Sequence, residues 1–145
     1  MYAGDVRSIA AICDAMKQEL RPRVPASWVI HSYDEIPEAH NDLPAIDITW
    51  DRGSDNRYAY QQGQRRSEIR ILLEVRLEQR ADLSMDMKLL TEGADTMREA
   101  LWESRSLGKQ VADLSWEYEI ARFEEGGQSR IFHLGFLFTC TVTLL

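Results

Sequence analysis

The chain has 145 residues, a net charge of −7 at neutral pH, 44% hydrophobic residues and 28% charged residues. This length favours one domain with one hydrophobic core, and the acidic balance argues against a general binder of duplex DNA. No apolar run reaches the ~20 residues that span a bilayer, and the opening MYAGDVRSIA has no signal-peptide pattern. We therefore expect a single domain over residues 1–145, made in the cytoplasm and without a membrane partner.

The first predicted element is a helix over about residues 5–21. Asp5 is a typical N-cap residue, and Pro22 cannot continue a helix. The apolar positions between them recur at helical spacing: Val6, Ile9, Ala10, Cys13, Met16 and Leu20. Cys13 and Cys140 are the two cysteines of the chain, and each occupies an apolar position of its element. This pattern predicts two buried free thiols in a reducing compartment.

Three strands and one long loop are predicted next. SWVIHSY is a short strand candidate, and AIDITW places Ile46, Ile48 and Trp50 on one face. Residues 51–67, DRGSDNRYAYQQGQRRS, have no period and predict a long polar loop. EIRILLEVRLEQR then predicts a long strand. Its apolar side carries Ile69, Ile71, Leu73, Val75 and Leu77.

Ten residues of this central region are candidate contacts between subunits or with a partner protein. The loop supplies Arg52, Arg57, Tyr58, Tyr60, Arg65 and Arg66, and the polar side of the following strand supplies Glu68, Arg70, Glu74 and Arg76. Arginine and tyrosine are enriched in protein interfaces, but the same pair also binds single-stranded nucleic acid. An exposed loop and a solvated strand face, neither with a partner, are the simpler interpretations.

A second helix and a hairpin complete the chain. Asp82 or Ser84 caps the helix, and Gly108 stops it after Leu107. Its apolar stripe is Leu83, Met87, Leu90, Ala94, Met97 and Leu101. Alternating residues around Trp116 and Tyr118, the Gly126–Gly127 turn and the closing RIFHLGFLFTCTVTLL predict a long antiparallel hairpin. The predicted fold is α+β in the order α-β-β-β-α-β-β, with a mainly antiparallel sheet and both helices packed on one face.

The sequence has no recognisable catalytic, metal-binding or cofactor-binding motif. His31, His40 and His133 lack a Cys or His at metal-ligand spacing, and the chain has neither a GxGxxG nor a P-loop pattern. We therefore expect no enzyme activity, no cofactor and no metal. A small α+β ligand-binding domain or enzyme is the alternative of a different class, and it predicts a cavity lined by His31, His133 and Trp116.

In order and size, these elements resemble the tail terminator, or tail-completion, proteins of long-tailed bacteriophages. The resemblance is carried by the helix DVRSIAAICDAMKQEL, the strand LPAIDITW, the strand EIRILLEVRLEQR, the helix DMKLLTEGADTMREALW and the closing FLFTCTVTLL. It implies a structural virion protein that forms a ring, commonly of six copies, at the head-proximal end of the tail tube. The implied partners are the chain itself, the tube protein and a neck or head-completion protein, with DNA only as passing cargo. Another neck or head-closure joining protein is the alternative within this class.

Overall fold

Seven elements make up the computed structural model, which describes residues 9–37, 43–57, 65–79, 86–104, 113–126 and 129–144. They are α1 (Ile9–Leu20), β1 (Val29–His31), β2 (Ala45–Arg57), β3 (Arg65–Gln79), α2 (Asp86–Glu103), β4 (Asp113–Gly126) and β5 (Ser129–Leu144). This is the predicted order, and the α+β fold class is confirmed. The N-terminal cap at Asp5 and the caps at Asp82 or Ser84 lie outside the described residues.

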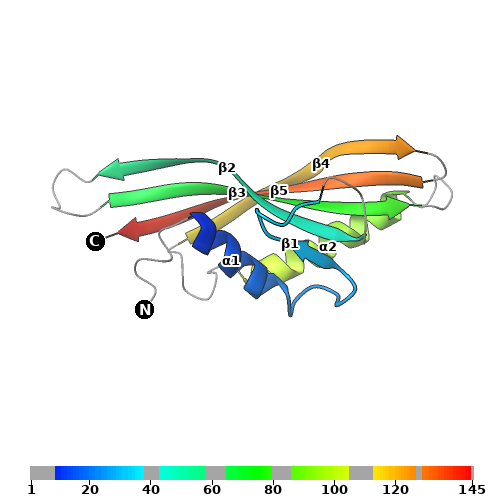
Figure 1. Ribbon diagram of the computed structural model, residues 1–145, viewed down its shortest axis with the longest axis horizontal. Helices are drawn as coiled ribbons and strands as arrows, with labels where there is room; N and C mark the ends of the chain where they lie inside the picture. The colour runs from blue at the N-terminus through cyan, green and yellow to red at the C-terminus, as the bar shows by residue number, and fades with distance from the viewer. Residues whose placement is uncertain are drawn as a thin grey trace.

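The five strands form one sheet in the order β1-β2-β3-β5-β4 (Figure 1). All neighbours are antiparallel except β1, which lies parallel to β2. The closing segment of the chain, β5, lies between β3 and its hairpin partner β4. The prediction that this apolar segment is a central strand is therefore confirmed.

The predicted polar loop at residues 51–67 is wrong at both of its ends. Residues 51–57 continue β2 and residues 65–67 begin β3, with Arg57 opposite Arg65. Backbone hydrogen bonds hold this ribbon together and require no apolar period, so polar side chains gave no strand signal. Figure 1 shows β2, β3 and the end of β5 running together past α1. Tyr58, Tyr60 and the rest of 58–64 lie outside the described residues.

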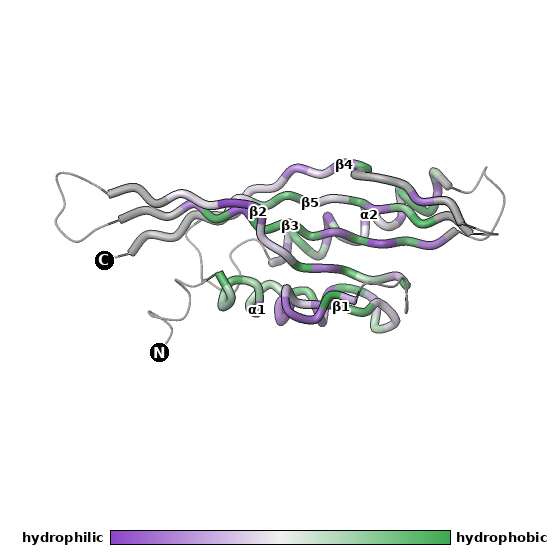
Figure 2. The backbone as a smooth tube through the Cα atoms, turned by 45° about the horizontal axis from the view of Figure 1, so that its top comes forward, coloured by the Kyte–Doolittle hydropathy of each residue, from purple (hydrophilic) through white to green (hydrophobic). Residues whose placement is uncertain are grey.

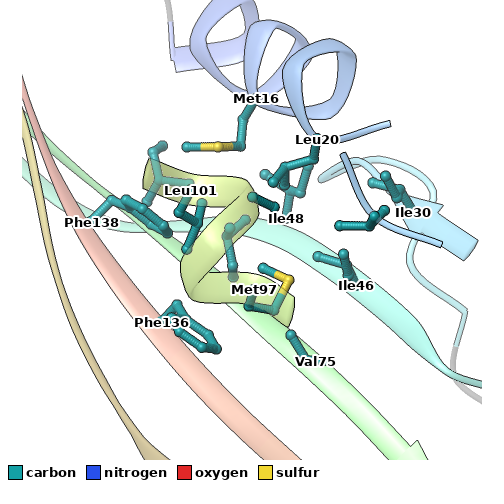
Figure 3. Close-up of a cluster of buried hydrophobic side chains, with 14 of the residues drawn as sticks. Met16, Leu20, Ile30, Ile46, Ile48, Val75, Met97, Leu101, Phe136 and Phe138 are labelled. Carbon is teal, nitrogen blue, oxygen red and sulfur yellow. The ribbon is translucent and has the colours of Figure 1, made fainter. Parts of the chain in front are cut away.

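One continuous hydrophobic core joins both helices to alternate residues of the strands. Figure 3 shows Met16 and Leu20 of α1 and Met97 and Leu101 of α2 among side chains of β2, β3 and β5. The predicted apolar sides of β3 and β5 are buried: Ile69, Ile71, Leu73, Val75, Leu77, Phe132, Leu134, Phe136, Phe138 and Cys140. Figure 2 shows the same alternation of hydrophobic and hydrophilic residues along β3. Both cysteines are buried free thiols, as predicted.

Helix α2 differs from its prediction at its end and at one stripe position. It ends at Glu103 rather than near Gly108, and the amide of Ser104 closes the last turn by donating to the carbonyl of Leu101 at 3.0 Å. Met87, which was predicted to be core, is 65% exposed and lies at the border of a groove between α2 and β4. Helix α2 approaches β3 closely at Gly93, where an added Cβ would lie 2.7 Å from a methyl group of the buried Leu77.

Candidate interaction surfaces

The sheet side opposite the core carries a buried ion pair between β2 and β3. Nε of Arg76 lies 2.8 Å from Oδ2 of Asp47, and Nη2 donates to Oδ1 at 3.1 Å. Nδ1 of His31 on β1 lies 3.0 Å from the same Oδ1. Arg76 is only 3% exposed. The predicted contact residue Arg76 is therefore enclosed within its own chain, and Asp47 links β2 to both β1 and β3.

A second polar cluster surrounds His133 in the middle of the sheet. This histidine is fully buried, and its Nδ1 contacts a carboxylate oxygen of Glu74. Its Nε2 lies 3.3 Å from a carboxylate oxygen of Glu124 on β4. Glu74, another predicted contact candidate, is thus held by a neighbouring strand. Charged side chains on the polar side of the sheet therefore contact one another across strands. The alternation of β3 alone does not show this.

The remaining candidates lie along the ribbon and do not form one site. Arg52 and Arg70 are opposite each other across β2 and β3, and Arg52 is exposed. Glu68 is half-buried. Arg57, Arg65 and Arg66 belong to strands, but their side chains are not among those described. Eleven residues separate Arg65 from Arg76, which corresponds to about 36 Å along a strand.

An exposed apolar surface beside β4 was missed by the sequence analysis. Tyr118 is 49% exposed and Ile120 is 51% exposed, although both point to the core side of the sheet, opposite Phe136 and Leu134. Trp102 of α2 is also exposed and meets Trp116 edge to face at 6.2 Å between centroids. We call Met87, Trp102, Tyr118 and Ile120 the β4 shelf.

The β4 shelf borders a groove of about 400 Å³ between α2 and β4. Its floor contains Leu134 and Phe136, and the guanidinium of Arg98 lies 5.5 Å above the ring of Tyr118. The sequence signal was present: Trp116, Tyr118 and Ile120 alternate as regularly as the buried residues of β5. The pattern identified the side of the strand but not whether a helix covers it.

The opposite side of β4 is acidic. Glu117 and Glu119, with Asp51 of β2, border a groove of about 380 Å³ whose apolar wall includes Leu72 and Leu137. No described residue forms an ion pair with Glu117 or Glu119. β4 therefore presents large apolar groups on one side and unpaired carboxylates on the other.

Neither edge of the sheet is fully paired among the described residues. β4 pairs only with β5, and β1 covers only Ala45–Asp47 of β2. Residues 48–57 therefore form an edge of β2 with which no other described strand pairs, called here an open edge. It carries Trp50, which is 52% exposed and not buried as its alternation with Ile46 and Ile48 suggested. The local register shifts between Trp50 and Arg52, so that Arg52 comes to the polar side with Arg70.

The described residues hold no group of three or more His, Cys, Asp or Glu side chains that could bind a metal ion. Burial raises the pKa of Cys140 to about 12, with the nearby Cys13 adding to the shift. Burial, assisted by the charge of Asp14, raises the pKa of Cys13 to about 11. At neutral pH both thiols are protonated and poor nucleophiles.

The cavity expected for a ligand-binding domain does not form from the residues predicted for it. His31 and His133 lie on the polar side of the sheet with Asp47 and Glu74. Trp116 lies on the core side, against Phe138 and Trp102. His40 lies outside the described residues. The three side chains therefore cannot line one pocket.

Comparison with known proteins adds no family. No family model matches this sequence, and no curated protein is significantly similar to it. Within the described residues, neither helix is long and apolar enough to cross a membrane.

Proposed function

We propose that this chain is a structural virion protein of the tail terminator class, which assembles into a ring at the head-proximal end of a phage tail tube. The observation that supports this most is a sheet with two different open edges, each beside exposed large hydrophobic side chains. Exposed apolar patches beside unpaired strands mark association sites in proteins. A ring requires such a pair of unlike patches, since each copy meets its neighbour through a different surface.

The proposed ring stops tube growth and joins the tail to the neck or head. Its partners are further copies of the chain, six in the expected ring, the tail tube protein and a neck or head-completion protein. DNA passes through without sequence-specific contact, and unpaired carboxylates such as Glu117 and Glu119 would keep it from adhering to a surface they face. The protein is made in the host cytoplasm and works in the virion.

Negative-stain imaging tests this function. The purified chain is examined alone and after mixing with polymerised tail tubes from the same virus or prophage. We expect rings, or caps at one end of each tube, and tubes whose length no longer increases when tube protein is added. Rings that bind a head-side adaptor and ignore tubes would assign the chain to head closure instead. Uncapped tubes, with no ring on either partner, would contradict the proposal.

A further inference from the structure

The directions of the strands make the two open edges compatible with each other. β2 and β5 run one way, and β3 and β4 run the other way. If the next copy in a ring has the same orientation, its β2 approaches β4 in the antiparallel sense. A junction between β4 and residues 48–57 of the next copy therefore continues the alternation already present within the sheet. This inference rests on the proposed ring and identifies its interface.

The side chains on the core side of the two edges are also suited to each other. Trp50 of β2 is half-exposed, and Tyr118 and Ile120 of β4 are half-exposed on the same side of the sheet. Pairing the edges places these groups in one row across the junction. Aromatic and β-branched side chains opposite each other are favourable cross-strand pairs. The junction would bury apolar surface that a single copy leaves in water.

Charge on the polar side selects which edges meet. Arg52 comes to this side beside Arg70, whereas β4 presents Glu117 and Glu119. Pairing β4 with a second β4 would set carboxylates against carboxylates, which opposes association. Pairing β4 with β2 brings these carboxylates toward the guanidinium of Arg52, which also lies 3.9 Å from Asp51 of its own edge. The occupant favoured by both sides of the sheet is therefore the open edge of β2 in a second copy.

We propose that β4 of each copy pairs with residues 48–57 of the next, so that one sheet runs continuously around the ring. Trp50 then packs on the β4 shelf, and Arg52 pairs with Glu117 or Glu119 of the neighbour. The contact is heterologous: each copy uses β4 on one side and β2 on the other.

Cysteine cross-linking of mixed variants tests this arrangement directly. Trp50→Cys and Tyr118→Cys are made separately in the full chain, and Trp116→Cys and Ile120→Cys cover the neighbouring registers. Each variant is oxidised alone and then in equimolar mixture at about 100 μM. The unmodified chain is the control, because its buried thiols have pKa values of about 11 and about 12 and remain protonated.

We expect a disulfide-linked dimer only in a mixture that contains Trp50→Cys and one of the β4 variants. A linked dimer from the β4 variants alone would overturn the proposal in favour of a two-fold contact. Absence of a mixture-specific product at all three β4 positions would overturn it as well.

Swapping the charges across the proposed junction gives a second test. Recovery of association in a double variant cannot result from loss of folding. Arg52→Glu and Glu119→Arg should each weaken association about tenfold by placing like charges together. The double variant should recover most of the loss, with Glu117→Arg as the alternative partner. Additive losses in both double variants would contradict the predicted pairing.

The tests separate this inference from the function on which it rests. If the unmodified chain forms rings in negative stain but the mixed variants give no cross-link, the proposed interface is contradicted and the proposed ring function stands. If the mixed variants cross-link but the chain never caps a tail tube or binds a neck protein, the proposed function is contradicted and the proposed interface stands.

Discussion

β4 and β5 are partners in one hairpin and carry the same kind of sequence, yet their side chains lie in opposite environments. On β5 the core-facing residues from Phe132 to Cys140 are 0–7% exposed, whereas Tyr118 and Ile120 on β4 are about half exposed. The polar sides differ in the same way: His133 is buried between carboxylates, while Glu117 and Glu119 are exposed. The comparison shows that alternation assigns a residue to a side of the sheet, and that its neighbours in space determine burial.

We interpret the two strands as serving different purposes. β5 holds the domain together, because it joins β3 to β4 and lies under the shared core of both helices. Among its described side chains, β4 contributes only the partly buried Trp116 to that core, and it retains an open edge. If this division is correct, substitutions near the centre of the sheet should unfold the chain, and substitutions on β4 should affect association instead.

The largest effect is expected at the buried ion pair of the central strands. Asp47→Ala leaves the Arg76 guanidinium buried without the carboxylate that holds it, and should lower the free energy of unfolding by about 3–5 kcal/mol. Denaturant unfolding of the full chain measures this loss. Glu92→Ala, which removes the exposed pair with Lys88, is the matched control and should stay within about 0.5 kcal/mol. Equal losses in both variants would refute a special role for the buried pair.

A matched pair of truncations tests the difference between the strands most closely. Leu134 on β5 and Ile120 on β4 are opposite each other in the ladder. Leu134→Ala should cost about 2–4 kcal/mol because it leaves a cavity in the core, whereas Ile120→Ala should cost less than about 1 kcal/mol. Unfolding at low protein concentration gives both values. Ile120→Ala should nevertheless weaken self-association, and a variant that assembles normally would contradict the role assigned to the β4 shelf.

A smaller effect is expected for the reactivity of the two buried thiols, which tests how firmly the core around β5 is held. Cys13 and Cys140 should resist alkylation in the native chain at pH 8 and react fully after unfolding, because burial keeps their pKa values near 11 and 12. Mass spectrometry after timed alkylation measures the extent of reaction. Rapid native modification of Cys140 would show that β5 opens easily and would argue against its central place.

The smallest expected effect lies outside the sheet, at the exposed pair of Lys17 and Glu35. Nζ of Lys17 donates to Glu35 at 2.8 Å, and this bond, assisted by the amide of Ser32, lowers the pKa of Glu35 below its ordinary value of 4.5. The resulting stabilisation is complete above pH 4.5 and is lost as the pH falls through the lower folded pKa. Glu35→Gln should slightly flatten the acid limb of a stability–pH curve. An unchanged acid limb would show that the pair contributes nothing.

The strands and helices that follow a strong apolar period could be read from the sequence. β3 and β5 alternate over ten residues or more, and the apolar side of each strand was assigned to the core correctly. The ribbon at residues 51–57 and 65–67 could not be read, since both of its sides are polar and only backbone pairing defines it. The parallel placement of β1 left no local pattern either.

The candidate surface was harder to predict, because it depends on contacts between segments that are distant in the sequence. Arg76 and Glu74 looked like partner-facing charges, because the sequence does not show that His31, Asp47 and His133 would enclose them. Alternation alone gave no sign that Trp50, Tyr118 and Ile120 would be half exposed, because the sequence does not show where the helices stop covering the sheet. Both features depend on contacts between distant segments, which only the three-dimensional arrangement shows.

The most direct measurement of the central claim, that copies join through two unlike edges of the sheet into a closed ring, is the mass of the assembled species. Sedimentation velocity or native mass spectrometry of the full chain, from about 1 to 200 μM and with tail tubes as a template, should give one closed assembly, six copies in the expected ring, whose mass stops rising with concentration. A chain that stays monomeric at every concentration and on tubes, or that grows without limit into open filaments, would contradict the account.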